Sequence, residues 1–141
     1  MKILIPVDGS DNAHRAVEHV IGYAAALKVA PQITLLNVQW KLASGNVKLF
    51  IDQDTINDYY REQGAAALAG ARAKLDAAGL AYSYHVSVGA PADAVIQYAQ
   101  EHQIDQIVMG AHGQGTLSSL LLGSVAGKVM QLAQIPVLLV K

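Results

Sequence analysis

The chain of 141 residues contains no cysteine, which excludes disulfide bonds, zinc–thiolate sites and cysteine nucleophiles. Its ten lysine and arginine residues are balanced by eleven acidic ones, so a formal net charge of −1 gives no electrostatic footprint for DNA or RNA. Although 52% of the residues are hydrophobic, no apolar run approaches the ~20 residues of a membrane-spanning helix. We therefore expect neither nucleic acid nor a membrane as partner, and the missing cysteines agree with a cytoplasmic location.

Short apolar runs alternate along the chain with longer amphipathic ones. Polar residues follow the first apolar run at once, so this run predicts a buried strand and not a secretory signal. The apolar runs predict five strands, at Ile3–Val7, Ile33–Val38, Tyr82–Val88, Ile104–Met109 and Val137–Val140. Apolar residues at helical spacing predict four helices, at Ala13–Leu27, Ile56–Ala78, Pro91–Glu101 and Val125–Gln134.

This order of elements predicts an α/β fold in a single domain of residues 1–141. Strands rich in Ile, Leu and Val are typical of a parallel sheet with helices on both faces, and right-handed crossovers make such a sheet doubly wound. We expect the common strand order 3-2-1-4-5, which places the first and fourth strands side by side. The third strand alternates polar and apolar residues, which predicts a position at a sheet edge.

A glycine-rich segment follows the fourth predicted strand, with glycines at positions 110, 113, 115 and 123. Glycine lets backbone N–H groups approach a phosphate, and a helix that begins near Ser124 would direct its positive dipole end at the same anion. Ligands of doubly wound sheets bind at the carboxyl ends of the strands, where the winding reverses. The turn that contains Asp8 would meet the glycine loop there. The loop therefore predicts a phosphate-binding site.

Two common phosphate-binding motifs do not fit this loop. Leu122 stands where a Walker A loop needs its first glycine, and Val129 replaces its Ser or Thr. A dinucleotide fingerprint only begins in the loop, and it follows the fourth strand instead of the first. The spacing that is present is glycine, two residues, glycine, nine residues, glycine and serine, formed by Gly110, Gly113, Gly123 and Ser124.

Together with the segments 6–10 and 135–140, this spacing resembles the universal stress protein family over essentially the whole chain. The resemblance implies the adenine-nucleotide α-hydrolase-like form of the predicted fold, ATP with Mg²⁺ as cofactor, and a homodimer formed by pairing of the strand Val137–Val140. It also implies that Val38 offers backbone groups to the adenine and that Asp8 meets the ribose or the phosphates. The implied nucleotide site consists of Pro6, Asp8, Val38, Met109, Gly110, His112, Gly113, Gly123, Ser124 and Val125.

The same residues allow structural interpretations. The glycines could only shape a turn, Asp8 could cap the first helix or hold a turn, and Ser124 could be a helix N-cap. His112 could be an ordinary loop residue. The other histidines, at 14, 19, 85 and 102, show no metal-ligand spacing and are expected at the surface or at an edge.

Two segments near the predicted site carry further expectations. The segment Gln39–Thr55 is too long for a tight connection, and we expect it to pack on its own domain or, as a second choice, to cover the adenine as a lid. The segment Gln114–Leu122 contains no Lys or Arg, where basic residues are common in the family it resembles. Backbone amides, helix dipoles and Mg²⁺ would then have to stabilise the negative charge of the phosphates.

Catalytic motifs are scarce in this sequence, which contains neither Gly-x-Ser-x-Gly nor His-Glu-x-x-His. Asp8 or His112 could orient a water toward the γ-phosphate and Ser124 could accept a phosphoryl group, which leaves slow ATP hydrolysis or autophosphorylation open. We predict an ATP-binding stress-response protein that acts as a nucleotide-dependent sensor or adaptor, with slow or no catalysis. The alternatives are a dimeric interaction module that does not use nucleotide and a slow ATPase or autophosphorylating enzyme.

Overall fold

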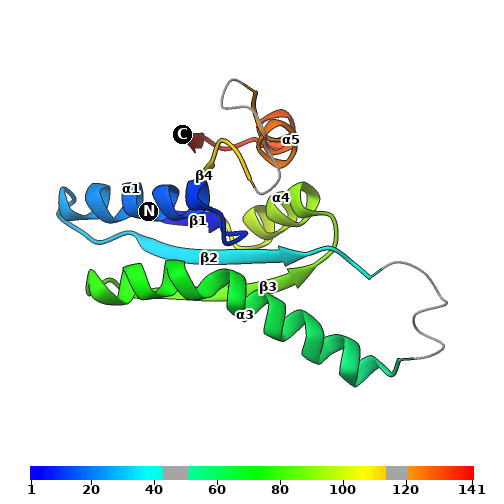
Figure 1. Ribbon diagram of the computed structural model, residues 1–141. Coiled ribbons are helices and arrows are strands. Elements are labelled where there is room, and N and C mark those ends of the chain that lie inside the picture. The colour runs from blue at the N-terminus through cyan, green and yellow to red at the C-terminus, as the bar shows by residue number, and fades with distance from the viewer. Residues whose placement is uncertain (43–50, 114–120) are drawn as a thin grey trace.

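The computed structural model describes residues 1–42, 51–113 and 121–141 (Figure 1). One parallel sheet contains β1 (Lys2–Pro6), β2 (Gln32–Gln39), β3 (Tyr82–Val88), β4 (Gln106–Gly110) and β5 (Val137–Val140). The helices in these residues are α1 (Asp11–Ala25), α3 (Gln53–Ala77), α4 (Pro91–Glu101) and α5 (Ser124–Leu132). Every predicted strand and helix is present. The largest shift is at the start of α3, which begins before Ile56 because the polar side chain of Asp52 caps it.

The strands follow the order β3-β2-β1-β4-β5, which confirms the predicted order and the doubly wound sheet. In the register, Ile3 of β1 lies opposite Ile33 of β2 on one side and opposite Gln106 of β4 on the other. All neighbouring strands pair in parallel, and the arrowheads of β2 and β3 in Figure 1 point the same way. β3 lies at one edge, as its alternating sequence predicts, and β5 lies at the other. The strand order therefore brings the ends of β1 and β4 together.

Helices cover both faces of the sheet, as predicted. Successive side chains of a strand point to opposite faces, so Ile3 and Ile5 pack on one face while Leu4 packs on the other. The first face is covered by α1 and α3 through fully buried side chains such as Val17, Leu68 and Leu75. The second face is covered by α4 and α5, which contribute Ala92, Val95, Ala99, Ala126 and Val129.

Helix α3 packs very closely on the sheet and on α1. A Cβ placed on Gly64 would lie 2.5 Å from Cγ2 of Val86, so this glycine permits the contact between α3 and β3. A Cβ on Gly70 would lie 2.7 Å from Nε2 of His14. That ring nitrogen is buried and has no hydrogen-bond partner among the described residues, although His14 as a whole is partly exposed. The histidines at 19, 85 and 102 are exposed, as predicted.

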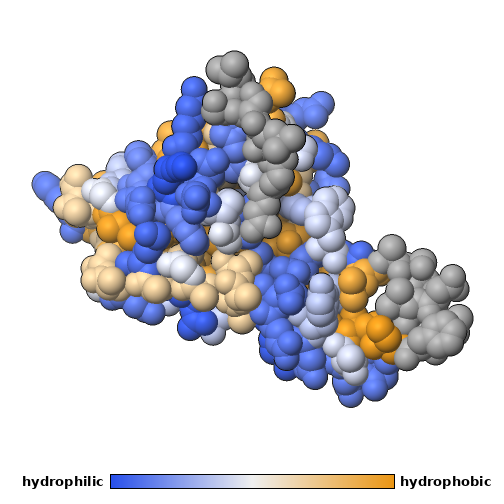
Figure 2. All heavy atoms as spheres, viewed as in Figure 1, coloured by the Kyte–Doolittle hydropathy of each residue, from blue (hydrophilic) through white to orange (hydrophobic). Residues whose placement is uncertain are grey.

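On the face drawn in Figure 2, polar and apolar areas alternate, and apolar residues also gather at the end where α3 begins. Ile51 lies at this end and is 40% exposed. No helix in the described ranges is long and apolar enough to cross a membrane. The part of the predicted loop at 43–50 lies outside the described residues, and so does the part of the glycine loop at 114–120.

Candidate functional site

A cleft of about 510 Å³ lies at the carboxyl ends of β1, β2 and β4, where the winding of the sheet reverses. This is the place at which doubly wound sheets bind ligands. The cleft is lined by every residue of the site that the family resemblance implies: Pro6, Asp8, Val38, Met109, Gly110, His112, Gly113, Gly123, Ser124 and Val125. The structure therefore brings together segments that are more than a hundred residues apart in the chain.

The turn after β1 forms one side of the cleft. Gly9 adopts a φ of +86°, and Asp8 Oδ1 accepts a hydrogen bond from the Ser10 N–H at 2.9 Å. Ser10 is the cap of α1, because its Oγ accepts from the Ala13 N–H at 3.2 Å. Of the two structural roles considered for Asp8, the structure thus shows the turn and assigns the cap to Ser10.

The glycine loop after β4 meets this turn. A Cβ on Gly113 would lie 2.9 Å from Oδ2 of Asp8, so the absence of a side chain lets the loop backbone approach that carboxylate. A Cβ on Gly110 would lie 2.8 Å from Cβ and 2.9 Å from the backbone carbon of Asn12 at the start of α1. The two glycines therefore shape the loop, and Gly113 also keeps the space beside Asp8 open.

The far end of the loop is fixed where α5 begins. The Gly123 N–H donates to the carbonyl of Ala111 at 2.8 Å, which joins the end of the loop to its beginning. Gly123 is the N-cap of α5 and Ser124 is the first helical residue, so the interpretation of Ser124 as the N-cap is wrong. The Gly123 carbonyl accepts from the Gly127 N–H at 2.9 Å, which makes it the first acceptor of the helix. The N–H groups of Ser124 and Val125 then have no partner within the helix.

Backbone groups of β2 also face the cleft. The Leu36 carbonyl accepts from the Val7 N–H at 2.8 Å on the β1 side, and the Gln39 carbonyl accepts from the Gly89 N–H at 2.9 Å on the β3 side. Residues two apart in a strand direct their backbone groups to the same side, so Val38 directs its N–H and carbonyl past the end of β1. Neither group has a backbone partner there in the described part of the chain. Both are available to a ligand.

Comparison with known proteins identifies the family to which this fold and site belong. The model of the universal stress protein family matches residues 1–141. The chain belongs to the universal stress protein family. The resemblance carried by the glycine spacing is thereby confirmed.

Individual relatives resemble this universal stress protein over nearly their whole length. MJ0531 of Methanocaldococcus jannaschii is 32% identical over 150 residues, which cover 99% of this chain and 81% of the relative. The solved structure of MJ0577 from the same organism has a TM-score of 0.84 at 29% identity and covers 99% of this chain and 94% of its own. A universal stress protein solved in complex with cAMP has a TM-score of 0.73 at 26% identity, with 100% and 97% covered.

The site expected from the sequence of this universal stress protein left out several residues of the cleft, three of which belong to the segment considered as a lid. Asn37, Gln39, Trp40, Leu42 and Tyr59 line it as well. Asn37 is 2% exposed, and its Nδ2 donates to the carbonyl of Val7 at 2.8 Å. Because a carbonyl only accepts, the Oδ1 of Asn37 must face Gln39, whose Nε2 donates to it at 2.6 Å. A polar residue at an inward position of the apolar strand β2 is the signal that could have found Asn37.

The charge of the cleft is low. Among its described lining residues Asp8 is the only acidic one, and none is Lys or Arg. Nδ1 of His112 is buried and has no hydrogen-bond partner among the residues that the structure describes. No group of three His, Cys, Asp or Glu in these residues could hold a metal ion. The cleft therefore offers mainly backbone amides, one carboxylate and one imidazole to a ligand.

Proposed function

We propose that this universal stress protein binds ATP with Mg²⁺ in the cleft and acts as a nucleotide-dependent sensor or adaptor in a stress response, with slow or no hydrolysis. The observation that carries the proposal is the start of α5, where no side chain caps the helix and the N–H groups of Ser124 and Val125 have no partner among the described residues, in the same cleft as Asp8. The relative in complex with cAMP supports a nucleotide as the ligand class. A cytoplasmic location stays a prediction, which cell fractionation would test.

Each part of the nucleotide has a matching group in the cleft. The adenine would form hydrogen bonds with the backbone N–H and carbonyl of Val38. Its ring would pack between the side chains of Val38 and Met109. The phosphates would accept hydrogen bonds from the backbone N–H groups of Gly113, Ser124 and Val125 and from the Ser124 hydroxyl. Mg²⁺ bound to nucleotide phosphates usually needs only one or two protein carboxylates and keeps several waters. Asp8 meets that requirement.

Occupancy of the site is the direct test. We expect adenine nucleotide to be released on denaturation of the purified protein, or calorimetry with Mg·ATP to give a saturable heat. Gly113→Val is the matched variant, because its side chain would occupy the space beside Asp8 Oδ2 and block the backbone amide. The absence of both nucleotide and heat at millimolar ATP would overturn the proposal and favour an interaction module that does not use nucleotide.

Turnover separates a binding protein from an enzyme. His112 and Asp8 line the cleft beside the phosphate-binding loop, where either could orient a water toward the γ-phosphate. We expect release of phosphate from Mg·ATP to be slow or absent. Phosphate release clearly above that of Gly113→Val, or a gain of one phosphate by mass spectrometry, would assign catalysis to the site.

The open edge of the sheet supports a homodimer. Pro136 and Val140 direct their carbonyls to β4, so Leu139 directs its backbone N–H outward, where a second copy of β5 could accept it. We expect a dimer at micromolar concentration by light scattering, formed by antiparallel pairing of Val137–Val140. Leu139→Pro removes the outward N–H and should give a monomer, whereas Leu139→Ala loses similar packing but keeps the N–H and should stay dimeric. A monomeric mass of the unmodified protein would contradict this assembly.

A further inference from the structure

Two exposed aromatic side chains line the cleft. Trp40 is 68% exposed and Tyr59 is 46% exposed, and both line the cleft. Large apolar rings are usually buried, so two of them that remain exposed at the rim of a binding cleft suggest a surface that a ligand covers. No aromatic contact joins the two rings in the part of the chain that the structure describes.

The backbone holds Trp40 in place from both sides. On one side, the carbonyl of Gln39 accepts from the Gly89 N–H at 2.9 Å, which fixes the end of β2 to β3. On the other side, the Leu42 N–H donates to the phenol oxygen of Tyr60 at 2.7 Å, which ties the chain to α3. The backbone at Trp40 therefore stands between two anchors, so little ordering of the backbone is needed before a ligand binds.

The second ring is held by its neighbour on α3. Tyr60 is only 9% exposed, and its ring meets the ring of Tyr59 edge-on, with 6.1 Å between the centroids and 61° between the planes. Edge-to-face pairs of this kind are attractive beyond their buried area. Tyr59 therefore contacts a buried ring and still keeps 46% of its surface exposed beside the cleft.

The position of Trp40 in the chain favours contact with the nucleotide base over contact with the phosphates. Trp40 lies two residues beyond Val38, whose backbone groups face the cleft, whereas the N–H groups proposed for the phosphates belong to the glycine loop and to the start of α5. From this placement we infer that Trp40, with Tyr59 as the second ring, forms an aromatic wall that stacks on the nucleotide base. The inference rests on the proposed nucleotide binding and adds the residues that hold the base.

Base stacking gives the wall a measurable effect. Removal of an aromatic ring that stacks on a base commonly weakens binding by about five- to a hundredfold. We expect Trp40→Ala to weaken Mg·ATP binding by about tenfold or more in calorimetry, and Trp40→Phe to retain most of the affinity. Binding of inorganic triphosphate, which has no base, should be equal in Trp40→Ala and the unmodified protein. Tyr23→Ala is the matched control, because Tyr23 is 41% exposed but lies outside the cleft lining.

Fluorescence gives a second readout on the unmodified protein. The chain contains a single tryptophan, so its emission reports on Trp40 alone. We expect Mg·ATP to quench this emission with the same midpoint as the calorimetric titration, and inorganic triphosphate to leave it unchanged. If ATP binds by calorimetry but Trp40→Ala has unchanged affinity, or the emission does not respond, the aromatic wall is overturned while the nucleotide site stands. If ATP does not bind the unmodified protein at all, the proposed function fails and the wall fails with it.

Discussion

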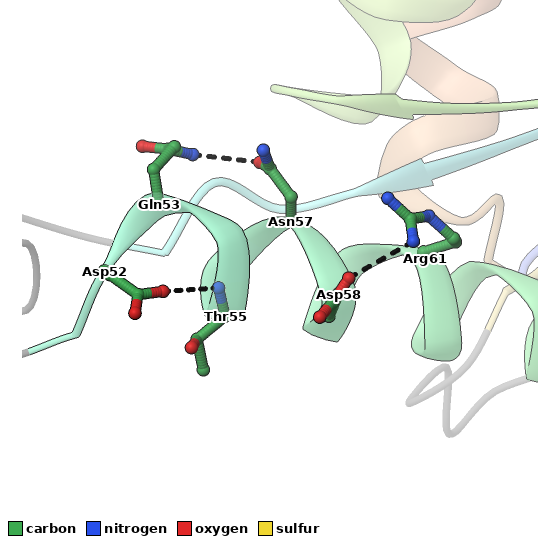
Figure 3. Close-up of polar contacts among 6 residues, drawn as sticks. All are labelled: Asp52, Gln53, Thr55, Asn57, Asp58 and Arg61. Atoms are coloured by element: carbon green, nitrogen blue, oxygen red, sulfur yellow. Dashed lines mark hydrogen bonds and ion pairs between the residues drawn. The ribbon is translucent and has the colours of Figure 1, made fainter.

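The starts of α3 and α5 differ in whether a side chain accepts a hydrogen bond from the first-turn N–H groups. At α3 the chain supplies its own acceptor, because Asp52 Oδ1 accepts from the Thr55 N–H at 2.7 Å (Figure 3). The same figure shows two further contacts of exposed side chains along this helix start, from Gln53 to Asn57 and from Arg61 to Asp58. At α5 the N-cap is Gly123, which has no side chain that could accept such a hydrogen bond.

The difference extends to charge. α1, α3 and α4 each carry an aspartate in their first turn, whereas α5 carries no acidic residue there. An acidic residue at a helix start interacts favourably with the helix dipole but also occupies the place of an external anion. A glycine cap costs the helix only about a few tenths of a kcal/mol relative to a capping side chain. The start of α5 therefore stays open for a phosphate at little expense of stability, while the start of α3 is closed.

The largest expected effect comes from giving α5 the cap that α3 has. Gly123→Asp introduces a side-chain acceptor for the first-turn N–H groups and a negative charge that repels phosphate. We expect Mg·ATP binding to weaken by at least about tenfold beyond any effect of Gly123→Ala, as measured by calorimetry.

Gly123→Ala is the matched control for crowding. Gly123 has a φ of −61°, which any residue adopts, but a Cβ there would lie 3.3 Å from the carbonyl oxygen of Ala111 and from Cα of His112. Both variants share this tight contact, and only the aspartate adds charge. Equal ATP affinities of the two variants would mean that the α5 start does not bind the phosphates.

A smaller effect is expected at the next residue. Ser124→Ala removes a hydroxyl that lines the cleft but is not the cap of α5. We expect ATP binding to weaken roughly three- to tenfold, with a thermal midpoint that does not fall. Ser124→Thr keeps the hydroxyl and should restore the affinity. A drop in the thermal midpoint with unchanged affinity would instead assign Ser124 a structural role.

Much of this comparison could be predicted from the sequence. The strands and helices follow from local apolar runs, and the convergence of the Asp8 turn with the glycine loop follows once the common strand order of doubly wound sheets is assumed. The cap of α5 could not be assigned, because glycine and serine are both favourable N-cap residues and stand side by side at 123 and 124. Trp40 belongs to the segment considered as a lid, but Tyr59 was missed as its neighbour in the cleft, because a long connection whose path no local pattern predicts separates the two.

A substitution at the closed helix start should affect stability and leave binding intact. Asp52→Ala removes the acceptor of the Thr55 N–H, so we expect the thermal midpoint to fall by a few degrees. The affinity for Mg·ATP should stay the same, because Asp52 is not part of the cleft lining. Asp54→Ala is the control, since it removes the same charge from the first turn without removing the cap hydrogen bond. An equal fall of the midpoint in both variants would show that charge, and not the cap, stabilises α3.

The smallest expected effect is the pH dependence of this cap. The hydrogen bond from the Thr55 backbone N–H holds the pKa of the Asp52 carboxyl below its ordinary value of 3.8. A carboxyl with a lowered pKa stabilises the folded state above its unfolded pKa, and this stabilisation is lost as the pH falls through the lower folded pKa. Asp52→Asn keeps an acceptor at the cap but cannot titrate, so its midpoint should lie slightly below that of the unmodified protein near neutral pH. The difference should stay constant down to about pH 5 and shrink below 3.8. The pKa of Glu18, which its hydrogen bond from Lys74 also lowers, is common to both proteins and cancels in the difference. A difference that grows on acidification would have the wrong sign for a cap that prefers the ionised carboxylate.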